Sequence, residues 1–278
     1  MAERPQRRQP SYHRGTVLRV ERLTPHLIRV VLGGETLAGF TAGSYTDHYV
    51  KIAFPAPGVT YPEPFDPEAA RRDLPREQWP VTRTYTVRAW DPGAVELTID
   101  FVYHGDEGIA GPWAARVRPG EELVFSGPGG GYSPDLGADW HLLAGDESAL
   151  PAIAAALERL PSDAVVYAFV EVENSGEELK LDSRITWLHR EGGQVGDLLV
   201  AAVQALEFPA GNVQVFVHGE ANFVKALRRH LRIDRAVPLP QMSISGYWRL
   251  GTDEDGWQSG KREWNQQVEA EETAASTR

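Results

Sequence analysis

Short hydrophobic runs separated by glycine, proline and polar residues recur along the first half of the chain. Within several runs hydrophobic and polar residues alternate, which is the period of a β-strand. Six runs at this spacing predict a small antiparallel barrel. They are TVLRVERLT (16–24), LIRVVLGG (27–34), DHYVKIAFP (47–55), TRTYTVRAW (82–90), AVELTIDFVYHG (94–105) and EELVFSGPGGG (121–131).

The pattern changes near Trp140, where short apolar runs begin to lead into amphipathic segments with helical spacing. Strand followed by helix, repeated along a chain, predicts a parallel sheet covered by helices. The strand-like runs are WHLLAG (140–145), AVVYAFVEV (164–172), ITWLHR (185–190) and VQVFVHG (213–219). The helix-like segments are DESALPAIAAALERLP (146–161), VGDLLVAAVQALEF (195–208) and EANFVKALRRHLR (220–232).

The two patterns together predict a β plus α/β fold with two domains. We expect a six-stranded antiparallel barrel over residues 1–137 and a parallel-sheet α/β domain over residues 138–250, joined through the glycine-rich segment SGPGGGYSPDLGAD. The remaining residues, 251–278, are acidic and then polar, and predict an extension with a short helix around residues 259–271 and a flexible end. Ligands of such folds often bind between the domains.

Composition narrows the classes of function. The 278 residues are enough for two domains with a sizeable core. With 28 basic and 39 acidic side chains the net charge is −11, which argues against nucleic acid or an anionic membrane as the main partner. The chain has no cysteine, so thiol catalysis and cysteine-ligated clusters are excluded. Any redox chemistry must therefore belong to a bound cofactor.

Other signals are negative. No window approaches the roughly 18–20 apolar residues of a membrane span, and no apolar run follows the basic N-terminus. We therefore expect a cytoplasmic protein without membrane insertion, and a monomer. The eight histidines show no metal-ligand spacing, and no nucleophile elbow supports a hydrolase.

One predicted strand, VTRTYTVRAWD (81–91), has no clean apolar face. Arg83 and Tyr85 fall on one face and Thr84 and Thr86 on the other. Downstream, Gly108 and Gly111 precede a short helical segment in YHGDEGIAGPWAARVRPGEEL. Free N–H groups at such a helix start attract phosphate, although a glycine-rich hairpin loop is the alternative. Combined with an arginine and a tyrosine upstream, an anion site beside a flat aromatic platform is favoured.

Four segments, taken together and in order, resemble the siderophore-interacting protein family of ferric-siderophore reductases, which are ferredoxin-reductase-like flavoproteins. The resemblance covers nearly the whole chain. The segments are RTYTVR (83–88), ELTIDFVYHGDEGIAGPWAARVRPGEEL (96–123), HLLAGDESALPAI (141–153) and GYWRLG (246–251).

The resemblance implies an FAD-binding barrel and an α/β domain that receives NAD(P)H. By the family pattern Arg83 holds the diphosphate, Tyr85 stacks on the isoalloxazine and Thr86 reaches its polar edge, roles that suit a guanidinium, a ring and a hydroxyl. A structural histidine is the alternative for His104. The implied FAD set is Arg83, Thr84, Tyr85, Thr86, Asp100, Val102, His104, Gly108, Ala110, Gly111, Trp113 and Ala114.

The nicotinamide site implied by the resemblance departs from that of typical ferredoxin reductases. Their strand-to-helix turn is glycine-rich, whereas Asp146, Glu147 and Ser148 follow Gly145 here and add negative charge where an anion would bind. These residues could instead cap the helix. In the second turn, Glu220 and Arg228 belong to the expected site, and a solvated helix face is the alternative for the arginine. The electron donor is left open among NADPH, NADH and reduced ferredoxin.

The substrate implied is an anionic ferric siderophore, with Lys51 and Arg249 matching basic positions that the family uses near the flavin. Exposed ion pairs are the alternative for both residues. Tyr247 and Trp248 are expected to pack or to form walls of the flavin site. Iron would be held by the siderophore, and electron transfer from the flavin needs no catalytic acid or base. The alternatives are a general flavin or ferredoxin reductase and a non-enzymatic siderophore-binding protein.

Overall fold

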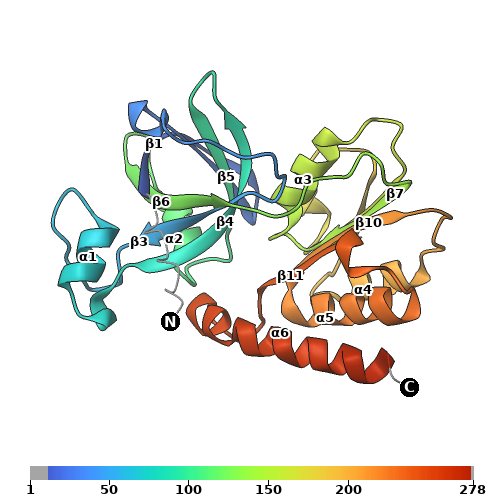
Figure 1. The fold of residues 1–278 in the computed structure, drawn as a ribbon. Coiled ribbons are helices and arrows are strands. Elements are labelled where there is room, and N and C mark those ends of the chain that lie inside the picture. The colour runs from blue at the N-terminus through green and yellow to red at the C-terminus, as the bar shows by residue number, and fades with distance from the viewer. Residues whose placement is uncertain (1–11, 277–278) are drawn as a thin grey trace, which may run out of the picture.

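The computed structural model describes residues 12–276 of the chain. Six strands form a closed antiparallel barrel in the order β1-β2-β5-β4-β3-β6, which confirms the predicted barrel (Figure 1). Alternate residues such as Val30, Ile52, Ile99 and Phe125 point inward and are fully buried. The strands are β1 (Tyr12–Thr24), β2 (Leu27–Gly33), β3 (Tyr49–Phe54), β4 (Val81–Asp91), β5 (Glu96–Val102) and β6 (Glu122–Gly129).

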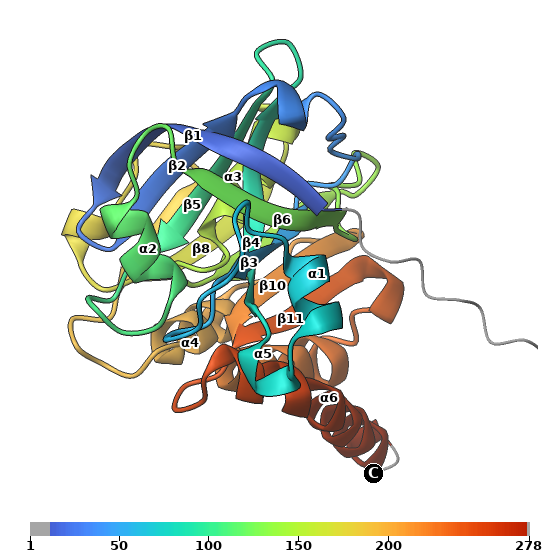
Figure 2. The same ribbon diagram turned by 90° about the vertical axis from the view of Figure 1, so that its left-hand side faces the viewer.

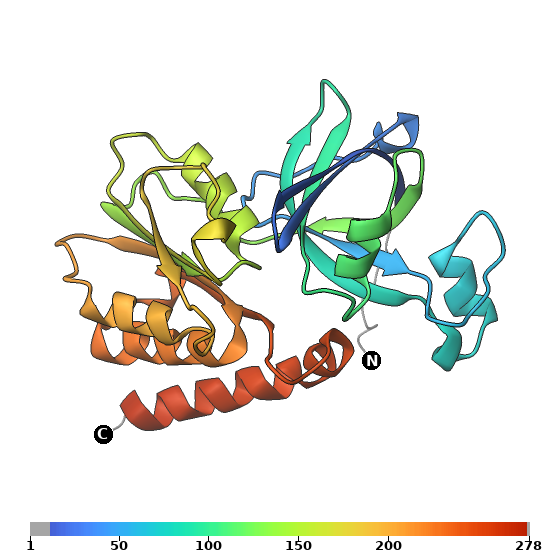
Figure 3. The same ribbon diagram turned by 180° about the vertical axis from the view of Figure 1, so that it is seen from behind.

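Two short helices lie on different sides of the barrel (Figure 2). Helix α2 (Ala110–Arg116) packs against β2 and β5. Helix α1 (Pro67–Asp73) lies in the long β3–β4 connection, which forms a lobe on the side away from the second domain (Figure 3). Asp66 begins α1 because its side chain accepts the N–H groups of Glu68 and Ala69.

The second half of the chain forms the predicted parallel sheet, in the order β11-β10-β7-β8-β9. Its strands are β7 (Trp140–Gly145), β8 (Val166–Val172), β9 (Ile185–His189), β10 (Val213–Glu220) and β11 (Met242–Trp248). Helix α3 (Leu150–Arg159) covers one face, and α4 (Asp197–Ala205) and α5 (Ala221–Arg229) cover the other. Single turns are η1 (Glu35–Leu37), η2 (Arg76–Gln78), η3 (Ser175–Glu177), η4 (His230–Asp234) and η5 (Leu239–Gln241).

The C-terminal segment differs from the prediction. Helix α6 spans Glu254–Ser276, 23 residues, instead of a short helix around residues 259–271, and it begins beside the barrel and runs beneath α5 (Figure 3). Trp257, Trp264 and Val268 are buried in the core below the sheet because their spacing places them on one helix face. The segment is therefore part of the α/β core. Of the flexible end predicted after residue 271, residues 272–276 belong to this helix, and residues 277–278 lie outside the described residues.

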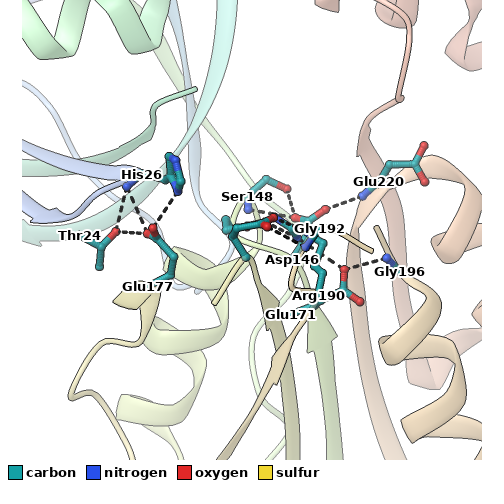
Figure 4. A network of polar contacts seen from close by, with 12 residues as sticks. Thr24, His26, Asp146, Ser148, Glu171, Glu177, Arg190, Gly192, Gly196 and Glu220 are labelled. Atoms are coloured by element: carbon teal, nitrogen blue, oxygen red, sulfur yellow. Dashed lines mark hydrogen bonds and ion pairs between the residues drawn. The ribbon is translucent and has the colours of Figure 1, made fainter. Parts of the chain in front are cut away.

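Side-chain contacts hold the two domains together. Arg88 of β4 pairs with Glu158 of α3, with Nη1 and Oε2 3.0 Å apart. Glu177 of η3 accepts the Thr24 hydroxyl and lies 2.7 Å from His26 Nδ1 at the β1–β2 turn (Figure 4). These contacts fix β4 and β5 opposite the carboxyl ends of the parallel strands. Within residues 12–276, the structure contains no helix of the length and apolar character that a membrane crossing requires.

Candidate functional site

A cavity of about 670 Å³ lies between the domains, within the size range of cofactor and ligand sites. One wall comes from β3, β4 and β5. The opposite wall comes from β10, β11 and the turn after β7, and α6 closes a third side. The residues of the predicted site that line it are Lys51, Thr84, Tyr85, Thr86, Asp100, Val102, His104, Glu147 and Ser148, together with the expected walls Tyr247 and Trp248.

Strand β4 contributes a flat ring and a hydroxyl to this cavity. The Tyr85 ring packs on Phe101 with centroids 4.4 Å apart. Burial raises the pKa of the Tyr85 phenol, so the ring is neutral at physiological pH. Thr86, the next residue of β4, is buried and lies opposite Tyr49 of β3. A ring backed by another ring, next to a hydroxyl, suits an aromatic cofactor with a polar edge.

The predicted phosphate ligand Arg83 is covered by the start of α6. Its Nη1 donates to the Thr82 carbonyl at 2.8 Å and to Asp255 Oδ2 at 3.2 Å, and its Nε lies 3.6 Å from Glu254 Oε2. Glu254 Oε1 also accepts the N–H of Thr84 at 3.0 Å. The C-terminal helix therefore begins at the arginine expected to hold the diphosphate, a contact that the sequence pattern did not suggest.

Two further residues of the predicted FAD set lie on β5 and just after it. The Asp100 carboxylate is 4 % exposed and accepts two hydrogen bonds from Arg29 of β2, at 2.7 and 2.8 Å. It therefore ties β2 to β5 while it lines the cavity. Desolvation, and then the neighbouring His26, lower the pKa of His104, so its imidazole is neutral at physiological pH. A neutral imidazole at the cavity wall is compatible both with contact to FAD and with a structural role for His104.

The residues around α2 lie outside the walls of the cavity. Gly108 adopts a left-handed conformation (φ 77°), which lets the chain turn before the helix. A Cβ on Gly111 would lie 2.8 Å from the Val102 carbonyl oxygen, so the approach of α2 to β5 requires glycine there. Ala110 and Ala114 are buried in the barrel core and Trp113 packs against it. Their predicted flavin contacts stay predictions.

The acidic turn after β7 is occupied by its own hydrogen bonds (Figure 4). The buried Asp146 carboxylate accepts the Ser148 N–H at 2.9 Å and the Ser148 hydroxyl. It also accepts the Glu220 N–H and the Trp248 Nε1–H, each at 2.8 Å. Burial, reinforced by the charge of Glu147, raises the pKa of Asp146 to about 6. One carboxylate thus joins both turns predicted to face a nicotinamide cofactor, at the sheet edge where dinucleotides bind.

Next to this turn, Arg190 is shared by several carboxylates. Its guanidinium pairs with Glu147, lies 3.2 Å from Glu173 Oε2 and lies 3.5 Å from Glu171 Oε1. Burial raises the pKa of Glu171, which also accepts the Gly196 N–H at 2.8 Å. Three carboxylates around one guanidinium leave this edge acidic. Sequence reasoning missed Arg190 because it lies on another strand end, far along the chain from Glu147.

The other residues predicted for the nicotinamide site have structural partners. A Cβ on Gly145 would lie 2.7 Å from the His218 carbonyl oxygen, so β7 requires glycine here. Glu220 caps α5, accepting the Asn222 N–H at 2.6 Å. Arg228 pairs with Glu272 of α6 through Nε and Nη2. It is neither in the cavity nor on a solvated helix face, so the structure supports neither reading of this arginine.

Two lysines give the cavity its positive charge. Lys51 of β3 and Lys261 of α6 both line it, and neither has an ion-pair partner within 4 Å among residues 12–276. Lys261 Nζ donates to Ser245 Oγ at 3.1 Å, and burial lowers the pKa of its ammonium. Sequence reasoning missed Lys261 because the C-terminal segment was taken for an extension. Arg249 is exposed after β11 and does not line the cavity.

The carboxylates that line the cavity are already engaged. Asp100, Glu147 and Glu254 each pair with an arginine. Asp47 accepts the N–H groups of Gly131 and Tyr132, both at 2.9 Å. An anionic ligand would therefore meet lysines without an ion-pair partner and carboxylates that already have an arginine or backbone N–H partner, in spite of the acidic composition of the whole chain.

Comparison with known proteins gives two family matches. A family described as the siderophore-interacting FAD-binding domain matches residues 16–132, and a family described as siderophore-interacting protein matches residues 138–251. The first match spans the barrel strands from β1 to β6. The second spans the parallel sheet.

Individual relatives cover most of the chain. Ferric vibriobactin reductase of Vibrio cholerae is 35 % identical over 252 residues, which are 86 % of this chain and 90 % of that protein. The NADPH-dependent ferric-chelate reductase of Escherichia coli is 34 % identical over 240 residues, 84 % of this chain and 91 % of that protein. The crystal structure of a siderophore utilization protein from T. fusca has a TM-score of 0.75 and 39 % identity, covering 87 % of this chain and 94 % of that chain.

Proposed function

The chain belongs to the siderophore-interacting protein family, and from this premise we propose that it is an FAD-dependent reductase of ferric siderophores. One observation carries the proposal. The strand predicted to hold a flavin, β4, and two lysines without a counter-charge line the same cavity although they come from distant parts of the chain. Flavin and anionic substrate would therefore be neighbours.

The residues present fit FAD. Tyr85 offers a ring backed by Phe101, and Thr86 offers a hydroxyl next to it. Arg83 lies on the same strand, where its guanidinium can bind a diphosphate. Bound FAD would supply the means to accept a hydride and pass electrons singly to Fe(III). The chain's own part is to hold the ring, satisfy its polar edge and anchor its phosphates.

The substrate would be attracted by charge. Lys51 and Lys261 lie on different walls of the cavity and can approach an anionic chelate from two sides. The siderophore itself would hold the iron, and Fe(II) is bound more weakly by hard oxygen ligands, so reduction releases it. Electron transfer requires that the chelate lie close to the flavin in the cavity, and it requires no acid or base from the chain.

NADPH is the donor that we propose, in line with the name of the Escherichia coli relative. Reduced ferredoxin is the second candidate, because the Asp146 carboxylate already accepts the N–H groups of Ser148 and Glu220 at the expected dinucleotide edge. Anaerobic bleaching of the flavin separates the two. Bleaching by NADPH supports the first donor, and bleaching by reduced ferredoxin alone would reject it.

The proposed function is tested by the oxidation of the reduced flavin by a ferric siderophore, the step that follows reduction by the donor. After anaerobic reduction, we expect ferric siderophores to reoxidise the flavin and to yield Fe(II) captured by a ferrous chelator. A general flavin or ferredoxin reductase would pass its electrons to its own acceptor whether or not ferric chelates are present. A colourless protein that cannot be reconstituted with FAD would indicate the binding-protein alternative.

Lys51→Gln and Lys261→Gln are each expected to raise the KM for an anionic ferric chelate roughly fivefold, since a partly solvated charge contributes about 1 kcal/mol of attraction. The rate of flavin reduction by the donor should not change. Lys225→Gln is the matched control, because Lys225 pairs with Glu271 on the surface at 2.8 Å. Equal KM values for all three variants and the wild type would refute the assignment.

Arg249 is tested in the same assay. Because its side chain is exposed outside the cavity, we expect Arg249→Ala to change the KM less than Lys261→Gln does. The cytoplasmic location and monomeric state expected from the sequence stay predictions.

A further inference from the structure

A second cavity, of about 370 Å³, adjoins the first between the outer face of the barrel, α1 and the start of α6. Lys51, Thr84, Glu254 and Gln258 line both cavities. A ligand seated at Lys51 can therefore extend from the first cavity into the second. Nothing in the proposed reduction of iron accounts for this extension.

Arg71 of α1 presents an uncompensated charge to the second cavity. Its Nη1 donates to the Tyr12 hydroxyl at 2.8 Å and its Nη2 donates to Thr82 Oγ1 at 2.7 Å. Both partners are neutral, and no carboxylate pairs with Arg71 in the part of the chain that the structure describes. By contrast, Arg72 on the same helix pairs with Asp73 at 2.7 Å. A guanidinium held by hydroxyls keeps its preference for a carboxylate.

The lobe that carries Arg71 is fastened to the barrel. Arg14 of β1 donates to the Phe65 carbonyl at 2.6 Å, just before α1. The Tyr61 hydroxyl accepts the Ala56 N–H at 3.1 Å and donates to the Gln78 carbonyl at 2.9 Å, which closes the lobe at its base. The guanidinium is thus oriented before any ligand binds, so little side-chain entropy would be lost on binding.

The second cavity lies against one face of β4. Thr82 and Thr84 line it, whereas Arg83 and Tyr85, which point to the opposite face of the strand, do not. The acidic residues Glu254 and Asp255 at its rim are engaged by Arg83. A ligand that extends from the first cavity to Arg71 passes Lys51, the predicted substrate residue, which lines both cavities.

We propose that Arg71 binds a free carboxylate on the periphery of the siderophore, remote from the iron. The inference rests on the proposed function and narrows its substrate class to ferric chelates that carry such an anionic arm. Lys51 and Lys261 attract the part of the anionic chelate that lies near the flavin, and Arg71 binds the carboxylate arm in the second cavity.

The test uses one linear ferric trihydroxamate in three forms, with its terminal amine free, acetylated or succinylated. The iron centre is the same in all three, and the terminus is an ammonium, a neutral amide or a carboxylate. Dissociation constants are measured with the FAD-loaded protein at physiological salt. We expect the carboxylate form to bind about tenfold more tightly than the amide form, as for a single charge-assisted pair at a partly exposed site.

Arg71→Gln should reduce the preference for the carboxylate form over the amide form to about twofold or less, because the variant cannot form the charge-assisted pair. Arg72→Gln removes the same charge from the same helix and should keep the ratio at its wild-type value. An equal ratio in the two variants, or no preference in the wild-type protein, would overturn the inference. If Arg71→Gln fails to fold, a wild-type protein without this preference would still refute the inference.

Two further results separate this inference from the proposed function. If all three chelates reoxidise the flavin but Arg71→Gln leaves their relative affinities unchanged, only the carboxylate subsite is refuted. If none reoxidises it, the reductase proposal is refuted and the subsite with it. Loss of FAD from Arg71→Gln would assign the second cavity to the cofactor and also overturn the inference.

Discussion

Replacing Arg83 with glutamine is expected to leave the purified protein largely without flavin. The guanidinium is the cation of β4 that the family pattern places on the diphosphate, and charge-assisted hydrogen bonds contribute about 1.5–3 kcal/mol each. We expect the dissociation constant for FAD to rise roughly 10- to 100-fold. Absorbance of the purified protein and a fluorescence titration with FAD measure the change.

Two comparisons make the Arg83 experiment specific. Riboflavin has no phosphate, so its affinity should be the same in Arg83→Gln as in the wild type. Arg88→Gln, on the same strand, removes an arginine that pairs with Glu158 of α3 outside the cavity, and should keep its FAD. Full flavin content in Arg83→Gln would show that another group anchors the diphosphate.

The carboxylates on α6 need their own variant, because Arg83→Gln also removes the contacts to Glu254 and Asp255. The double variant Glu254→Gln, Asp255→Asn removes the acidic partners and leaves the guanidinium in place. FAD should be retained in it. A loss of flavin equal to that of Arg83→Gln would mean that docking of α6, and not the arginine's charge, holds the cofactor.

Asp146→Ala is expected to lower the free energy of unfolding by about 3–5 kcal/mol, the largest effect on stability that we predict. The substitution leaves the N–H groups of Ser148, Glu220 and Trp248 without their buried acceptor. Denaturant unfolding followed by tryptophan fluorescence measures the loss. Asp73→Ala is the control, since Asp73 is an exposed partner of Arg72 and its loss should leave the free energy of unfolding nearly unchanged.

The raised pKa of Asp146 adds a pH signature. Its pKa of about 6 in the folded protein lies above the ordinary aspartate value of 3.8, so between these two pH values the folded state holds a proton that the unfolded state has released. The stability from this group is fully present below the unfolded pKa and is lost as the pH rises through the folded pKa. Relative to Asp146→Asn, the wild type should lose up to about 3 kcal/mol from pH ~4 to pH ~7. A stability difference that stays constant or grows with pH would contradict this.

The architecture could be predicted from the sequence because it depends on local periodicity. Alternating residues in the first half and strand–helix repeats in the second are properties of adjacent residues, and they specify the barrel and the parallel sheet. The extent of α6 was missed, since its apolar residues Trp257, Trp264 and Val268 are few among polar ones. They identify a buried helix face only when α5 and the sheet are present to cover them.

For the site, the sequence by itself determined the kinds of residue on β4 and in the turn after β7, and with them the family. Only the tertiary structure decided which charges have partners. In the sequence Asp146 and Glu147 either add negative charge to the turn or cap the helix, but in the fold they contact Glu220, Trp248 and Arg190 from distant elements. The sequence did not single out Lys261 or Arg71, but they line the two cavities. The reason is physical: periodicity acts between neighbours along the chain, whereas ion pairs form between groups that only folding brings within a few ångströms.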